Sequence, residues 1–191
     1  MENALYIRTE ASHSLNFLVY IQNLYLNQSL SRDDLKFPHI PTKCVFRKDF
    51  DVCFNGLWDE VSKKIWEDPL YDLKLFAEEK TFYQGLFIDN EATLYEFREI
   101  YQSFLVWWSS IAGHFSIERS IDEKVQETYA ELTNLLNKKG INPRKELFIS
   151  LIYDECLLAD FEPYSYFTIL STRDFFMHCK ELISKLETSI Y

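Results

Sequence analysis

The segment from Ile100 to Ile117 contains no formally charged residue, in a chain of which 26% of the residues are charged. Such a run is typical of a helix that the rest of the protein surrounds. A membrane span is the competing interpretation, but polar residues such as Gln102, Ser103 and His114 would lack partners in hydrocarbon. We therefore predict a buried central helix at about residues 90–112.

Composition indicates a chain that folds into one helical domain. Apolar residues make up 47% of the 191 residues and aromatic residues 17%, which is ample for a sizeable core and argues against disorder. The chain has only 4 Gly and 5 Pro, too few for the tight turns of an all-β protein. We expect an all-α fold over residues 1–191, a single-domain bundle of roughly six or seven helices.

Apolar spacing and end signals place the expected helices along the chain. Residues 43–54 and 81–88 fit a strand as well as a helix, although the helical pattern that starts at Phe50 is the longer one. Helices are expected to start after Ser12 or Ser14, at Phe50, at Asp68, at Asp89 or Asn90, at Asp122, at Asn142 and after Ser171 or Thr172; the helix from Asn142 should run toward Ala159.

The charge balance narrows the classes of partner. Twenty basic residues against thirty acidic ones give a net charge of −10, which repels nucleic-acid backbones and favours encounter with a basic protein. Residues 1–10 lack the pattern of a signal peptide, and we expect no membrane association. The four cysteines form no CxxC pair and are expected to be reduced. A cytoplasmic location follows from these features.

No motif in the chain gives positive evidence for catalysis. GxGxxG, Walker, HExxH and GxSxG sequences are all absent. Carboxylate and imidazole pairs do occur at helical spacing, and such pairs can contribute to metal sites in helical bundles. The absence of these motifs leans against an enzyme without deciding the question, and we expect neither a catalytic residue nor a cofactor. The pairs and triplets with this spacing are Glu10 with His13, His178 with Glu181, and Glu123 with Glu127 and Glu131.

One acidic stretch is the candidate partner site. From Glu146 to Thr172 there is no Lys or Arg, while carboxylates alternate with aromatic residues. Acidic groups beside tyrosines can hold Lys or Arg through ion pairs and cation–π contacts. The alternative is an ordinary loop that its aromatic side chains anchor in the core. The predicted partner-binding residues are Asp154, Glu155, Asp160, Glu162, Tyr164 and Tyr166.

Three functions are compatible with these features. The first is a non-catalytic binding protein, a regulator or inhibitor of a basic partner such as a toxin or nuclease. The second is a metal-dependent enzyme whose carboxylates and histidines converge in a helical bundle. The third is a ligand-binding sensor, in which Trp107 or Trp108 faces an aromatic-lined cavity. The sequence identifies neither the partner nor the oligomeric state.

Overall fold

The chain packs into two compact units. The computed structural model describes residues 5–40, 45–76, 80–177 and 179–190. The first unit, here called the sheet unit, comprises Met1–Ser12, His114–Glu155 and Phe161–Tyr191. The second, here called the helical unit, comprises His13–Gly113 and the short segment Cys156–Asp160. The prediction of one domain stays a prediction, since the compactness of two units does not show that either folds alone.

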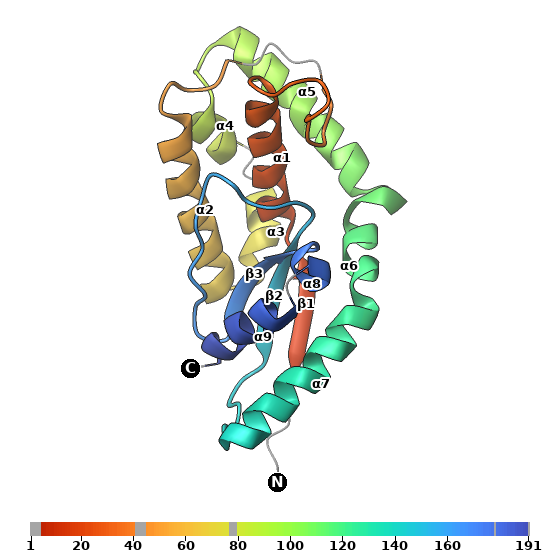
Figure 1. Ribbon diagram of the computed structural model, residues 1–191. Coiled ribbons are helices and arrows are strands. Elements are labelled where there is room, and N and C mark those ends of the chain that lie inside the picture. Colours follow the sequence, from red (N-terminus) through yellow and green to blue (C-terminus); the bar gives the residue numbers. More distant parts are fainter. Residues whose placement is uncertain (1–4, 41–44, 77–79, 178, 191) are drawn as a thin grey trace. The chain divides into compact units, whose positions relative to one another are not determined.

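A three-stranded parallel sheet organises the sheet unit, with β1 (Ile7–Ala11), β2 (Leu147–Ile152) and β3 (Phe167–Ser171) in that spatial order (Figure 1). Ile7 pairs with Leu147, and Phe148 pairs with Phe167. Every residue of β3 and nearly every residue of β2 is buried. A strand that is covered on both faces typically consists of a continuous run of apolar residues, and the sequence of β2 is nearly such a run.

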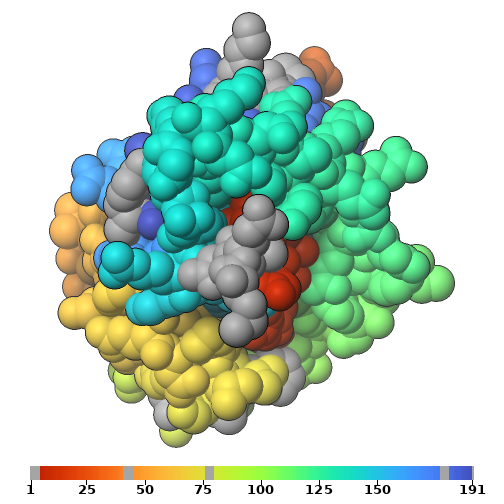
Figure 2. All heavy atoms as spheres, turned by 90° about the horizontal axis from the view of Figure 1, so that it is seen from below, coloured from red at the N-terminus to blue at the C-terminus, as the bar shows by residue number. Residues whose placement is uncertain are grey.

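Helices cover this sheet. The short α6 (Ser116–Ser120) packs on β1 and β2, and α8 (Asp174–Met177) packs on β3. The longer α7 (Asp122–Lys139) packs against α8 and α9 (Cys179–Thr188), and it lies at the surface on the face that Figure 2 shows in teal. Gly140 ends α7 with a φ of 66°, a left-handed conformation that glycine adopts without steric cost.

The helical unit is built around α1 (His13–Asn27), whose residues from His13 to Leu24 are all buried. α1 packs against α2 (Phe50–Glu67), α3 (Tyr71–Phe76) and α5 (Glu91–Trp108), while α4 (Lys80–Leu86) packs on α2. A kinked segment, η1 (Ile111–Phe115), follows α5; its Gly113 has non-helical dihedral angles, and the chain passes there from the helical unit into the sheet unit.

The N-terminus of α1 is capped by a carboxylate from α3. The backbone amides of His13 and Ser14 donate to Asp72 Oδ2 and Oδ1 at 2.7 and 2.9 Å. The first amides of a helix have no partner inside it, and a negative charge there is favourable for the helix dipole. The cap therefore links α3 to the start of the most buried helix of the unit.

Replacing Asp72 should measurably destabilise the protein. Asp72→Ala leaves two amides at the start of α1 without their acceptor, and we expect the free energy of unfolding to fall by about 1–2 kcal/mol. Urea unfolding at pH 7 measures the change. Asp59→Ala removes an exposed carboxylate from α2 and serves as the control. Equal stability of the two variants would contradict this role of Asp72.

The all-α prediction was wrong, because three strands form a parallel sheet. The error arose mainly at Asn142–Ala159, which was predicted as a helix and instead contains β2. Leu147, Leu151 and Ile152 fit a helical face, but a short continuous apolar run fits a buried strand equally well. β1 and β3 were not predicted at all.

The prediction of a central helix at residues 90–112 was also wrong. α5 buries one stripe, formed by Thr93, Phe97, Ile100, Tyr101 and Phe104, whereas Val106 is 74% exposed. α1 occupies the centre of its unit instead. Within the uncharged stretch Gln102 is also exposed, so the absence of charge did not mean burial.

Several helices were predicted correctly. α2 and α7 agree closely with the expected bounds, and the uncertain start at Phe50 is helical. α5 begins as expected but ends at Trp108, before the predicted residue 112. Residues 80–86 form α4, and Phe46 and Phe87 form an isolated antiparallel bridge. The helix expected from Asp68 is the shorter α3, and the final helix is two helices, α8 and α9. Residues 43, 44 and 77–79 lie outside the described residues.

Candidate functional site

A pocket of about 370 Å³ on the helical unit, here called the acidic pocket, is the leading candidate site. One wall is the first turn of α2. The other is the segment Cys156–Asp160, which follows β2 in the sequence and belongs to this unit. Two of its residues are carboxylates, and none of the described residues that line it is Lys or Arg. The lining residues are Asp51, Val52, Asn55, Leu157, Leu158, Ala159 and Asp160.

A buried glutamine of α1 fixes the second wall. Gln22 is fully buried, and its Oε1 accepts hydrogen bonds from the backbone amides of Leu157 and Leu158 at 2.7 and 3.1 Å. Cys156 begins the segment, and burial raises the pKa of its thiol to about 12, so the thiol stays neutral at physiological pH. A buried amide bonded to two backbone groups holds a loop in one position. The wall is therefore preformed.

The first wall is fixed by aromatic packing. Tyr25 of α1 stacks on Phe50 with 4.0 Å between ring centroids. Burial, together with the charge and hydrogen bond of Asp51, raises the pKa of Tyr25. The Tyr25 hydroxyl therefore donates to the Asp51 carboxylate and helps to orient it. A carboxylate accepts more than one hydrogen bond, so Asp51 keeps acceptor capacity for a cation.

The apolar part of the acidic pocket is open to solvent. Val52 is 76% exposed and Leu157 is 52% exposed, which is high for branched aliphatic side chains. Asp51 and Asp160 are both exposed beside them. The pocket thus offers carboxylates and unburied apolar surface within one small area.

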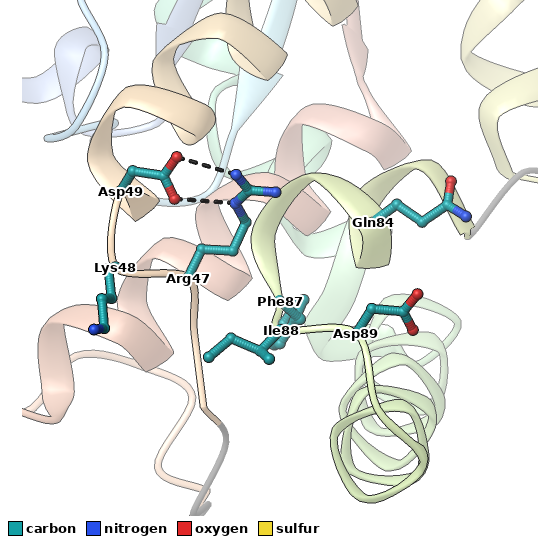
Figure 3. A pocket seen from close by; sticks show the side chains of 7 residues that line it. All are labelled: Arg47, Lys48, Asp49, Gln84, Phe87, Ile88 and Asp89. Carbon is teal, nitrogen blue, oxygen red and sulfur yellow. Dashed lines mark hydrogen bonds and ion pairs between the residues drawn. The ribbon is translucent and has the colours of Figure 1, made fainter.

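A second pocket of the same unit, here called the mixed-charge pocket, has a volume of about 570 Å³. Arg47 forms a forked pair with Asp49, Nε to Oδ1 and Nη2 to Oδ2, both at 3.0 Å. The Arg47 hydrogen bond lowers the pKa of Asp49 to about 2. Figure 3 shows these two side chains pointing toward each other, whereas Gln84 and Asp89 extend on the other side of the pocket. The lining residues are Arg47, Lys48, Asp49, Gln84, Phe87, Ile88 and Asp89.

The charges of the mixed-charge pocket balance within the protein. Two cations, Arg47 and Lys48, stand against two carboxylates, Asp49 and Asp89, and the guanidinium already has a bidentate partner. An incoming charged group would have to compete with that pair. None of the described residues that line the acidic pocket is a cation that could compensate its carboxylates, so it is the better candidate for binding a charged partner.

The structure divides the predicted partner-binding residues between the two units. Asp160 lines the acidic pocket. Asp154, Glu155, Glu162, Tyr164 and Tyr166 belong to the sheet unit. There Glu155 pairs with Arg173 at 3.3 Å, and the Asp154 carboxylate accepts from the Glu155 amide at 2.8 Å. Glu162 is exposed.

The two tyrosines of that segment make internal contacts. Tyr164 stacks on buried Phe167 and contacts the ring edge of Phe161. The Tyr166 hydroxyl accepts from the Arg144 amide at 2.8 Å, and Tyr166 has a φ of 58°, which is uncommon for a residue other than glycine. These contacts favour the alternative interpretation, in which aromatic side chains anchor a loop.

The residues considered for a metal site are dispersed. Glu123, Glu127 and Glu131 are exposed along α7, where Glu127 pairs with Lys124 at 2.6 Å. Glu10 lies in β1 and His13 begins α1, so they do not share a helical face. His178 lies outside the described residues. Within the described ranges, no three or more His, Cys, Asp or Glu residues are placed to hold a metal ion.

The tryptophans named for a ligand cavity pack against other rings. Trp107 lies on Tyr20 and Phe37, at centroid distances of 6.0 and 5.1 Å. Trp108 stacks on Phe104 at 5.5 Å. Neither indole lines the acidic pocket or the mixed-charge pocket.

Comparison with protein-family models, with curated proteins and with solved structures finds no match to this chain. None of the helices in the described part of the chain has both the length and the apolar character needed to cross a membrane. Cys53 and Cys156 are free thiols. Functional inference therefore depends on the geometry and chemistry of the site.

Proposed function

We propose that this protein is a non-catalytic binding module that regulates or inhibits a basic protein partner through the acidic pocket. The observation that carries the proposal is the composition of the pocket. Asp51 and Asp160 lie beside exposed apolar side chains, and no Lys or Arg among the described lining residues neutralises them. Lys and Arg side chains combine a cationic head with an apolar stem, and both parts find complementary surface there.

The overall charge supports the same partner class. A net charge of −10 attracts a basic protein over distances of about a Debye length, roughly 8–10 Å at physiological salt. Association should therefore be fast and should slow as salt is added. We include a cytoplasmic location in the proposal, since the free thiols of Cys53 and Cys156 suit a reducing compartment.

This function can be tested by selecting binders from a random library of peptides of about ten residues. The affinity of the protein for the selected peptides is then measured by titration. We expect enrichment of Lys and Arg among the selected peptides. Their affinity should be about two- to twenty-fivefold lower in Asp51→Asn with Asp160→Asn, because two exposed ion pairs are lost. The control is Asp59→Asn with Glu99→Gln, which removes the same charge from exposed sites on α2 and α5. Selected peptides without basic residues, or an equal loss of peptide affinity in both double variants, would refute the proposal.

A further inference from the structure

The acidic pocket combines two kinds of surface whose contributions to binding differ in size. Asp51 and Asp160 are exposed, and an exposed ion pair changes affinity by no more than about fivefold. Val52 and Leu157 are 76% and 52% exposed, and covering the exposed part of a side chain of this size changes affinity by about five- to thirtyfold. The apolar surface should therefore contribute more to affinity than the carboxylates do.

Charge alone would also give little selectivity for this pocket. The chain has 30 acidic residues, and many other exposed carboxylates would attract a purely polybasic segment equally well. In this pocket, each carboxylate adjoins apolar residues in the sequence itself. Asp51 precedes Val52, and Asp160 follows Leu157, Leu158 and Ala159.

Two backbone amides of the second wall already have a hydrogen-bond acceptor. The amides of Leu157 and Leu158 donate to Gln22 Oε1 at 2.7 and 3.1 Å. These amides are therefore not available to a partner strand. At an open sheet edge, by contrast, unpaired amides would let such a strand bind through its backbone. Recognition at this wall must come from side chains.

We propose that the pocket takes an amphipathic basic segment, in which Lys or Arg adjoins a Leu, Ile, Val or Phe side chain, and not a purely polybasic one. This inference rests on the proposed function and specifies its partner. The cationic groups contact Asp51 and Asp160, while the apolar side chain covers Val52 and Leu157. Both faces of the segment are needed for tight binding.

Two synthetic peptides of equal length and charge test the inference: one contains Lys and Leu, and the other has Ser in place of every Leu. We expect the Lys–Leu peptide to bind at least tenfold more tightly at about 150 mM salt. Val52→Ser with Leu157→Ser should abolish most of that difference. Both residues are exposed, so these substitutions should leave the fold intact. Leu70→Ser with Leu73→Ser changes exposed side chains on or beside α3, outside the pocket lining, and should leave binding unchanged.

The outcomes separate this inference from the function on which it rests. If both peptides bind equally and only Asp51→Asn with Asp160→Asn weakens them, the partner is polybasic; the inference fails and the proposed function stands. If the Lys–Leu peptide binds and neither pair of pocket variants weakens it, or if neither peptide binds, both proposals fail. A Lys–Leu preference that is lost in Val52→Ser with Leu157→Ser supports the inference.

Discussion

Acidification from pH 7 to pH 4 is expected to lower the free energy of unfolding by up to about 3 kcal/mol through His13 alone. The imidazole is buried at the start of α1 and contacts the rings of Phe104 and Trp108 edge to face. Burial lowers its pKa from 6.5 to about 4, and the nearby negative charge of Asp72 opposes this shift without cancelling it. The folded protein therefore keeps His13 neutral where the unfolded chain protonates it.

The sign of the effect follows from which state binds the proton first. Below about pH 6.5 the unfolded chain takes up a proton at His13, but the folded protein does so only near pH 4. The stabilisation is thus fully present above pH 6.5 and is lost as the pH falls toward 4. Urea unfolding between pH 7 and pH 4 measures it, with His13→Leu as the variant that lacks the titrating group.

The variant should lose less stability than the natural protein over the same interval, by up to about 3 kcal/mol. His39→Leu, at an exposed position, is the matched control and should follow the natural protein. Parallel pH profiles for the natural protein and His13→Leu would show that His13 is not responsible.

Gly113→Ala should destabilise the protein by about 2–4 kcal/mol, because its backbone position leaves no room for a Cβ atom. A Cβ at this position would lie 2.2 Å from the carbonyl oxygen of Trp107 and 2.5 Å from that of Trp108. Both contacts are with backbone, so no side-chain rotation relieves them. The end of α5 and the turn of η1 would have to shift.

Gly56→Ala is the matched control, since Gly56 lies within α2 and no described atom outside the helix backbone is within 4 Å of the place that a Cβ would occupy. Alanine has a higher helix propensity than glycine, so the free energy of unfolding of this variant should increase by about 0.5–1 kcal/mol. Thermal and urea unfolding of both variants give the comparison. A Gly113→Ala protein as stable as the natural one would mean that the close approach is relieved without cost.

Helices were the part of the fold that the sequence predicted well. α2, α5 and α7 each present one apolar stripe at helical spacing and a polar face, and this pattern has one interpretation. The strands β2 and β3 are buried on both faces and do not alternate. A short apolar run without alternation is compatible with strand or helix, so periodicity could not distinguish them.

The sequence contained a sign that the helix at the centre of the helical unit is α1 and not α5. The sequence from Ala11 to Ser31 also lacks charged residues, and it exceeds the stretch from Ile100 to Ile117 in length. In α1 the apolar residues occupy all sides of the helix, whereas in α5 they leave one side to polar groups. The distribution of apolar residues around the helix, and not the absence of charge, distinguishes the two.

The acidic pocket was only partly within reach of sequence reasoning. Asp160 was singled out because it lies in an acidic segment that lacks Lys and Arg. Asp51, Val52 and Asn55 are on the solvent side of a helix for which only the apolar face was predicted. Nothing local brings residues 51–55 together with 157–160; the hydrogen bonds of Gln22, which looked like any polar residue of a helix, hold that second segment in the helical unit.

The pairing of Ile7 with Leu147 has a consequence for the order in which the chain assembles during synthesis. The ribosome releases β1 early, but its neighbour β2 emerges only after all of α1 to α7. The helices from α1 to α5 can collapse on one another in the meantime, because their contacts join segments made within a shorter interval. β1 therefore stays unpaired while residues 12–146 are made, and its backbone groups can pair with other chains during that interval.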